Sequence, residues 1–119
     1  MKFTIAREEE FVPKWNENDK AEEPIKFILK NLNTVEREGL TSVDFSDDGK
    51  PHIKIDFIRA CRIGIRKIEN LIVENKAIEK AQDFLDCPVP GFSELAREVG
   101  SHVVAANAPQ TEDERKNLQ

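Results

Sequence analysis

The sequence predicts an α+β fold in which a small antiparallel sheet of about four short strands is packed by three helices. Three observations favour this class. Apolar and polar residues alternate in several short stretches, as they do in half-buried strands. An Asp48-Gly49 pair separates two of these stretches, where a tight hairpin turn requires positive φ. Other stretches repeat their apolar residues at helical spacing.

The expected strands span residues 2–6, 25–30, 42–46 and 52–55. In the first, Phe3 and Ile5 alternate with polar residues. In the second, "IKFILK", apolar residues occupy both faces, so this strand is expected to be covered on both sides. The last two strands form the hairpin, and Pro51 begins the return strand, where a missing N–H is tolerated.

A short helix is expected directly behind strand 25–30, in "NLNTVEREGL". Asn33 or Thr34 can cap it, because their side-chain oxygens accept the free N–H groups of a first turn. Glu36 lies where the helix dipole favours negative charge. Gly39 can end the helix in a left-handed conformation. This segment is therefore predicted to be a corner that turns the chain toward the hairpin.

The three larger helices are expected at residues 56–64, 78–86 and 92–106. Asp56 and Ser93 are candidate N-caps for the first and the last of them. Pro88 ends the second.

The end of the first helix is open to two interpretations. Apolar residues recur at helical spacing from Phe57 to Ile72, which supports one helix to about residue 72. Gly64 costs roughly 1 kcal/mol against alanine inside a helix. The helix can therefore stop near Gly64 and leave 65–73 extended.

Residues 1–108 are predicted to form a single domain, and the polar residues 109–119 a flexible tail. Within the domain, the charged stretch 7–24 is predicted to be an arm or long loop. Trp15 is interpreted as pinning this arm to the domain. The functional alternative is an anchor for a partner protein, a role in which aromatic residues are enriched.

Composition excludes several classes of protein. The chain has 119 residues and a net charge of −5, which argues against broad binding to nucleic-acid phosphates. No apolar run approaches the roughly 18 residues of a membrane helix. The N-terminal "MKFTIAREEEF" is not a secretion signal, so the interior of a cell is the expected location.

No motif predicts an enzyme or a cofactor site. His52 and His102 lack neighbours at metal-ligand spacing. Nucleophile and nucleotide-binding motifs are absent from the sequence. Cys61 and Cys87 lie far apart and are expected to be small buried hydrophobic residues. We therefore expect a non-enzymatic protein with no cofactor.

Arg59, Arg62 and Arg66 are predicted to form a basic stripe at helical spacing, i, i+3 and i+7. The main interpretation of this stripe is a solvated surface. Binding to an acidic protein surface is the second, and nucleic-acid binding is the least favoured, because there is no helix-turn-helix partner and no aromatic platform.

Three stretches of the sequence carry a resemblance to known proteins. They are "KFTIAREEEFVPKWNEN" with "IKFILKNLNTVEREGL", "FIRACRIGIRKIENLIVENKAIEKAQDFL", and "ELAREVGSHVVAANAPQTEDERKN". In the order of their elements they resemble small tail proteins of bacteriophages and prophages, in particular tail assembly chaperones. The resemblance also favours a break near Gly64, with an extended segment and then a turn.

The resemblance implies a non-enzymatic protein in the bacterial host cytoplasm that binds the tape measure protein, the tail tube protein or both. It leaves self-association open and implies no membrane. The alternatives are a minor structural or head–tail joining virion protein and, less favoured, a nucleic-acid-associated regulator. The candidate partner-binding residues are Phe11, Trp15, Arg59, Arg62, Arg66, Glu114, Arg115 and Lys116.

Overall fold

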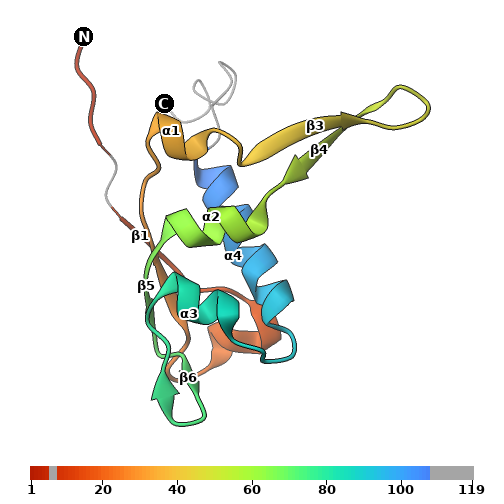
Figure 1. Cartoon of the computed structure of the whole chain (residues 1–119). Coiled ribbons are helices and arrows are strands. Elements are labelled where there is room, and N and C mark those ends of the chain that lie inside the picture. Colours follow the sequence, from red (N-terminus) through yellow and green to blue (C-terminus); the bar gives the residue numbers. More distant parts are fainter. Residues whose placement is uncertain (6–7, 108–119) are drawn as a thin grey trace.

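The computed structural model describes residues 1–5 and 8–107, and it confirms the α+β class (Figure 1). The first and last of the three larger helices lie where they were predicted, and the second is shorter than expected. The candidate tail residues Glu114, Arg115 and Lys116 lie outside the described residues. In chain order the elements are β1 (Glu9–Phe11), η1 (Trp15–Lys20), β2 (Lys26–Leu29), α1 (Thr34–Arg37), β3 (Thr41–Phe45), β4 (Pro51–Ile55), α2 (Phe57–Gly64), β5 (Ile65–Glu69), β6 (Ile72–Val73), β7 (Lys76–Ala77), α3 (Ala81–Asp86) and α4 (Phe92–Ala106).

The strands form three antiparallel sheets and not the single sheet that was expected. A three-stranded sheet has the order β1-β2-β5, while β3 pairs with β4 and β6 pairs with β7 in separate two-stranded ribbons. The expected hairpin at 42–46 and 52–55 is therefore correct, but it does not join strand 25–30. Its two strands pair only with each other in the described part of the chain.

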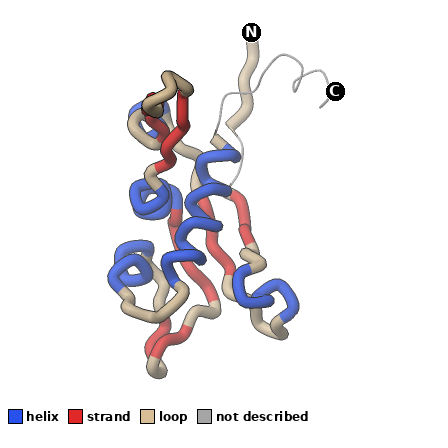
Figure 2. Tube along the Cα trace, turned by 90° about the vertical axis from the view of Figure 1, so that its right-hand side faces the viewer, coloured by secondary structure: helices blue, strands red, loops and turns tan. Residues whose placement is uncertain are grey.

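One hydrophobic core lies between the three-stranded sheet and α4, with α2 and α3 closing its sides (Figure 2). Phe27 of β2 and Val99 of α4 are fully buried. Phe27 also meets the ring of Phe84 in α3 edge-on, at 5.5 Å between centroids. We call the sheet with α2, α3 and α4 the body of the molecule.

A bulge in β5 explains why a segment whose apolar residues recur at helical spacing forms a strand. Ile28 pairs with Lys67, but the next residue of β2, Leu29, pairs with Ile65, so the register skips Arg66. One extra residue shifts the alternation of a strand. Ile65 and Ile68 therefore both face the core, although three positions separate them. The predicted break near Gly64 is confirmed, because α2 ends there.

Two glycines let α2 and α4 approach each other closely. A Cβ added at Gly64 would lie 2.7 Å from a methyl carbon of Val103. A Cβ added at Gly100 would lie 3.0 Å from the carbonyl oxygen of Phe57. Gly64 therefore serves the packing of the two helices as well as marking the helix end.

The corner behind β2 forms as the sequence predicts. Asn33 accepts the N–H of Glu36 at 2.8 Å, and the Glu36 carboxylate accepts the N–H of Asn33 at 3.1 Å. This reciprocal pair is a capping box. Gly39 follows the helix with φ +80°. The corner lies between the last residue of β2 and the first residue of β3.

Two details of the N-terminal region differ from expectation. The predicted strand 2–6 is wrong over residues 2–5, which belong to no strand, and residue 6 is not described. The first strand is β1, inside the stretch expected to be an arm. β1 gains a partner because Phe11 packs on α4, whereas Phe3 is exposed and has no apolar surface opposite it.

The caps and starts of the later helices also differ. Ser93 does not cap α4, because Gly91, with φ +91°, occupies the N-cap position. α3 begins at Ala81 and not at 78, because the Ile78 N–H donates to the Leu71 carbonyl and holds that residue beside β5.

Candidate protein-binding surface

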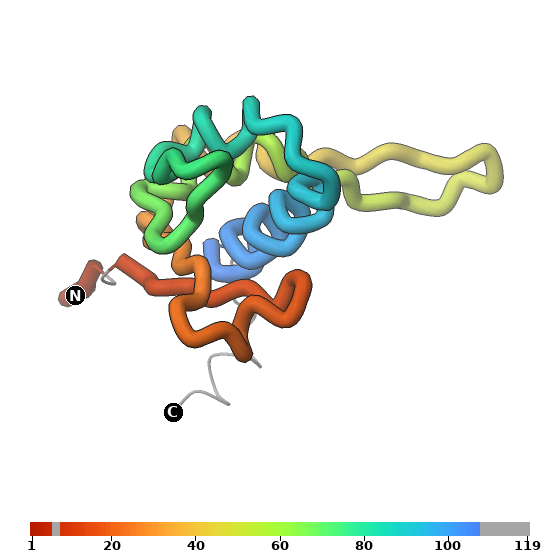
Figure 3. The backbone as a smooth tube through the Cα atoms, turned by 90° about the horizontal axis from the view of Figure 1, so that it is seen from below, coloured from red at the N-terminus to blue at the C-terminus, as the bar shows by residue number. Residues whose placement is uncertain are grey.

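The β3–β4 hairpin projects from the body as a two-stranded ribbon (Figures 1 and 3). Every residue of β3 is exposed, and in β4 only Ile55, next to the body, is half-buried. Isolated two-stranded ribbons are marginal in water unless another surface supports them. A projecting ribbon of this kind is therefore a candidate for contact with another molecule.

The hairpin has one apolar face and one polar face. Side chains that lie directly opposite in an antiparallel pair share a face. The apolar face is made of the pairs Thr41–Ile55, Val43–Ile53 and Phe45–Pro51, and the polar face of the pairs Ser42–Lys54 and Asp44–His52. On the apolar face Val43 is 57%, Phe45 72% and Ile53 73% exposed. Ordered apolar surface left in water is typical of an interaction site.

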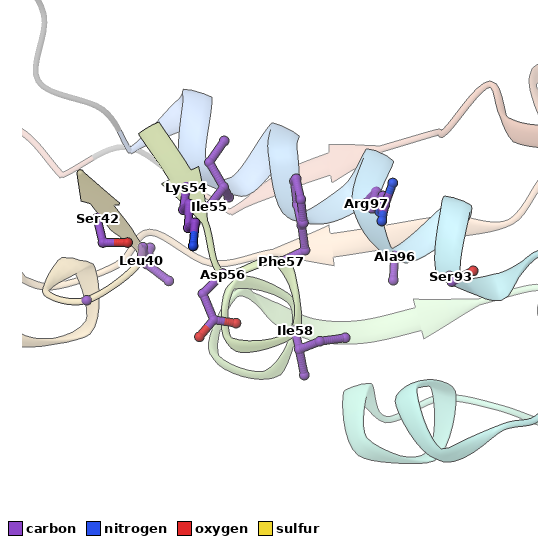
Figure 4. Close-up of a pocket in the computed structure, with 11 residues that line it drawn as sticks. Leu40, Ser42, Lys54, Ile55, Asp56, Phe57, Ile58, Ser93, Ala96 and Arg97 are labelled. Atoms are coloured by element: carbon purple, nitrogen blue, oxygen red, sulfur yellow. The ribbon is translucent and has the colours of Figure 1, made fainter. Parts of the chain in front are cut away.

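A groove of about 580 Å³ lies at the base of the hairpin (Figure 4). Its apolar wall includes Leu40, Ile55 and Phe57, and Ala96 closes it from α4. Arg97 and Lys54 add positive charge to its lining. From the hairpin, Ser42 and Lys54 of the polar face and Ile55 line the groove, so it lies beside the polar face where the ribbon joins the body.

Local bonds fix the turn and the polar face of the hairpin. Gly49 has φ +81°, as the predicted tight turn requires. Asp48 accepts hydrogen bonds from the Ser46 hydroxyl and from the Lys50 N–H, and these two bonds hold the pKa of its carboxyl below the usual value. Lys54 forms an ion pair with Asp44, which raises the pKa of the lysine. The ribbon is thus ordered by its own polar contacts.

The two aromatic candidates of the arm pack against the body. Phe11 stacks on the His102 ring, with 4.1 Å between centroids. Trp15 meets Phe92 edge-on at 5.8 Å. The interpretation of Trp15 as a pin is therefore the one that its packing favours. His102 also contacts Glu9 at 2.6 Å, which ties α4 to β1.

The three arginines do not form one helical stripe. Arg59 and Arg62 lie in α2, but Arg66 lies in β5, beyond the end of the helix. Arg62 donates to Gln82 at 3.4 Å, and Arg66 pairs with Glu8 at 2.9 Å. The guanidinium of Arg59 lies over Gly39, so that a Cβ there would be 3.2 Å from Nη1. The fold thus separates the charges that the nucleic-acid interpretation required to act together.

Among residues 1–5 and 8–107, no cluster of three His, Cys, Asp or Glu side chains could hold a metal ion. Cys61 is buried as predicted and donates to the Ala96 carbonyl at 3.2 Å. Burial raises the pKa of its thiol to about 12. Because the thiolate is the reactive form, this cysteine is inert at neutral pH.

In the part of the chain that the structure describes, no helix has both the length and the apolar character needed to cross a bilayer. No protein-family model, no curated protein and no solved structure matches this chain. The exposed face of the hairpin and the resemblance of the three sequence stretches are therefore the two indications of function.

Sequence reasoning missed the hairpin as the candidate surface. It identified both strands and the turn but assigned them to the central sheet. The sequence offers no local signal for this outcome, because the alternation in β3 and β4 is that of any half-buried strand.

Proposed function

We propose that this protein is a non-enzymatic bacteriophage tail assembly factor, a chaperone that binds the tape measure protein, the tail tube protein or both. The observation that carries the proposal is the ordered hairpin with an exposed apolar face. The resemblance of the three sequence stretches to tail assembly chaperones supplies the biological context.

The apolar face of the hairpin is the client-binding surface in this proposal. An aggregation-prone helical client presents apolar side chains that need a complementary surface. Val43, Phe45 and Ile53 supply that surface. The charged residues of the opposite face and the net charge of −5 keep such a surface in solution.

Co-expression with a fragment of a tape measure protein from the same phage or prophage genome tests the proposal. The wild-type chain is expected to keep the fragment in the soluble fraction after lysis. A triple variant of the apolar face, Val43→Thr, Phe45→Thr and Ile53→Thr, is expected to lose this effect. The matched control, Asp44→Thr with His52→Thr on the polar face, should retain it.

If the fragment precipitates equally with the wild-type chain and with the triple variant, the chaperone proposal is wrong. Gene order provides an independent check. A tail tube gene upstream and a long tape measure gene downstream are expected.

A minor structural protein of the virion is the second candidate. The observation that favours it is the projection of residues 1–5 and of the hairpin from opposite sides of the body (Figure 3). Two surfaces facing away from each other suit a subunit that is built into an assembly. Mass spectrometry of purified particles separates the candidates, because a structural protein remains in the particle and a chaperone does not.

A further inference from the structure

We propose that residues 1–5 of one copy pair with the outer edge of β3 in a second copy, so that the protein associates head to tail. This inference goes beyond the proposed client binding and does not depend on it. It stands on two segments of the same chain that are complementary and that both lack a partner among the described residues.

The first segment is the extended N-terminus. Phe3 is 84% and Ile5 93% exposed, although both alternate with polar residues in the pattern of a half-buried strand. The body offers this segment no strand to pair with. The segment therefore has the sequence pattern of a strand but pairs with no strand in the described part of its own chain.

The second segment is the free edge of β3. The Ser46 N–H donates to the Lys50 carbonyl, which makes this pair a hydrogen-bonded one. Hydrogen-bonded and non-bonded pairs alternate along an antiparallel ladder. The backbone N–H and C=O groups of Thr41, Val43 and Phe45 are therefore directed away from β4 and are available to an added strand.

The β3 edge accepts a strand better than the β4 edge does. On β4 the outward positions are 51, 53 and 55 by the same alternation, and Pro51 has no N–H to donate. β3 presents three outward donors, and β4 presents two. Unpaired edges with intact donors are the usual template for pairing with another chain.

One antiparallel register satisfies the side chains on both faces. With Phe3 opposite Val43, Met1 lies opposite Phe45 and extends the apolar face of the ribbon. The same register places Lys2 opposite Asp44 on the polar face, where opposite charges attract across the strands.

The placement of the two segments makes the association head to tail. The N-terminal segment and the hairpin lie on opposite sides of the body (Figure 3). A copy that donates its strand on one side therefore accepts a strand on the other. Heterologous contacts of this kind build rings or open chains. Edge pairing leaves the apolar face of the ribbon open and widens it by Met1, Phe3 and Ile5.

Sedimentation velocity over a range of protein concentrations tests the proposal without any client. The wild-type chain is expected to form species larger than a dimer as the concentration rises. Val43→Pro removes an outward N–H from the β3 edge and should leave the protein monomeric. Ile53→Pro removes the equivalent group from the β4 edge and should associate like the wild type.

Thermal unfolding of both proline variants checks that they are folded. Removal of residues 2–5, which are all exposed, provides a variant that leaves the core intact, and it should also be monomeric. A monomeric wild-type chain at all concentrations would overturn the proposal. Equal association of Val43→Pro and the wild type would do the same.

Cross-linking fixes the register. Lys2 and Asp44 would form a non-bonded pair, in which Cα atoms lie about 4.5 Å apart and a disulfide fits. A chain carrying Lys2→Cys and Asp44→Cys together with Cys87→Ser is expected to oxidise into a ladder of multimers on a non-reducing gel. Cross-linking that stops at a dimer would contradict the head-to-tail arrangement.

Discussion

The body and the β3–β4 hairpin use the same kinds of residue for opposite purposes. In β2, Phe27 and Leu29 alternate with other residues and are 0% and 4% exposed. In β3, Val43 and Phe45 alternate in the same way and are 57% and 72% exposed. Local pattern makes both segments strands. The two strands differ in what covers them: α4 packs against β2, whereas no described element packs against β3.

The body and the hairpin are therefore stabilised by different interactions. Burial of a large apolar side chain stabilises a fold by about 1.5–3 kcal/mol, and the body collects this many times over. The hairpin gains little stabilisation from apolar burial, and its turn and polar contacts hold it in place. Its apolar face therefore remains available for association, which would supply the burial that the monomer lacks.

The largest expected effect comes from removing one phenylalanine ring in each region. Phe27→Ala should lower the free energy of unfolding by about 4 kcal/mol, because it empties a fully buried site next to Phe84. Phe45→Ala, on the exposed face, should lower it by at most about 0.5 kcal/mol. Urea denaturation at a protein concentration that keeps both variants monomeric measures both values.

A comparable loss of unfolding free energy in Phe45→Ala would contradict the difference between the body and the hairpin. It would mean that the apolar face packs on the body in solution. A loss that grows with protein concentration would instead point to burial of Phe45 in an association.

The close approach of α2 and α4 predicts a second large effect in the body. Gly100→Ala should destabilise the protein by about 2 kcal/mol, because the new methyl group meets the backbone of Phe57, which cannot move aside as a side chain can. This cost outweighs the gain of about 1 kcal/mol in helix propensity. Ser93→Ala, at an exposed position of the same helix, should change the midpoint of urea unfolding very little.

The N-terminal loop depends on one buried side chain and predicts an effect of similar or slightly smaller size. Asn18 accepts the Ile25 N–H at 2.8 Å and donates to the carbonyls of Pro13 and Ile25 at 3.0 Å each. Asn18→Ala leaves these backbone groups without their partner and should cost about 2 kcal/mol. Asp19→Ala, at an exposed position of the same loop, is the control for the general effect of substitution there.

Hydrogen exchange reports on Asn18→Ala locally. Faster exchange at the Ile25 amide, with the amides of α4 unchanged, is expected if the loss is confined to the loop. Uniform acceleration across the body would show that the loop is part of the cooperative core.

Much of the fold could be predicted from residues whose structural role depends only on their neighbours in the sequence. Gly49 at the hairpin turn, Asn33 and Glu36 at the capping box and the helix at 92–106 all follow from neighbours in the sequence. The segment after Gly64 was harder, because the bulge at Arg66 gives a strand the apolar spacing of a helix. A bulge depends on the partner strand, and the partner is not visible in a local pattern.

The candidate site was less predictable than the fold for the same reason. Trp15 was singled out as an aromatic anchor, yet whether an anchor faces a partner or the body depends on what lies opposite, here Phe92. The apolar face of the hairpin looks like any half-buried strand until the rest of the chain fails to cover it. Exposure is a property of the assembled molecule, and alternation in the sequence does not encode it.

The smallest expected effect lies at the corner between the two regions, where a charge can be removed without changing shape. The ion pair with Lys30 and the Asn33 N–H lower the pKa of the Glu36 carboxyl below its usual value of 4.5. A lowered pKa contributes stability that is complete above the usual value and is lost as the pH falls through the lowered one. Glu36→Gln keeps the capping geometry but loses the charge, so it should cost about 0.5 kcal/mol at pH 7.

Below the lowered pKa the wild-type carboxyl is neutral, so Glu36→Gln and the wild type should then unfold at the same temperature. Glu38→Gln, at an exposed position of the same corner, should match the wild type at both pH values.

Following the backbone NMR signals of β3 and β4 in the Glu36 variant separates two mechanisms. If only the signals around α1 shift, the corner acts as a passive joint. If the hairpin signals broaden as well, the capping box also sets the direction in which the hairpin leaves the body.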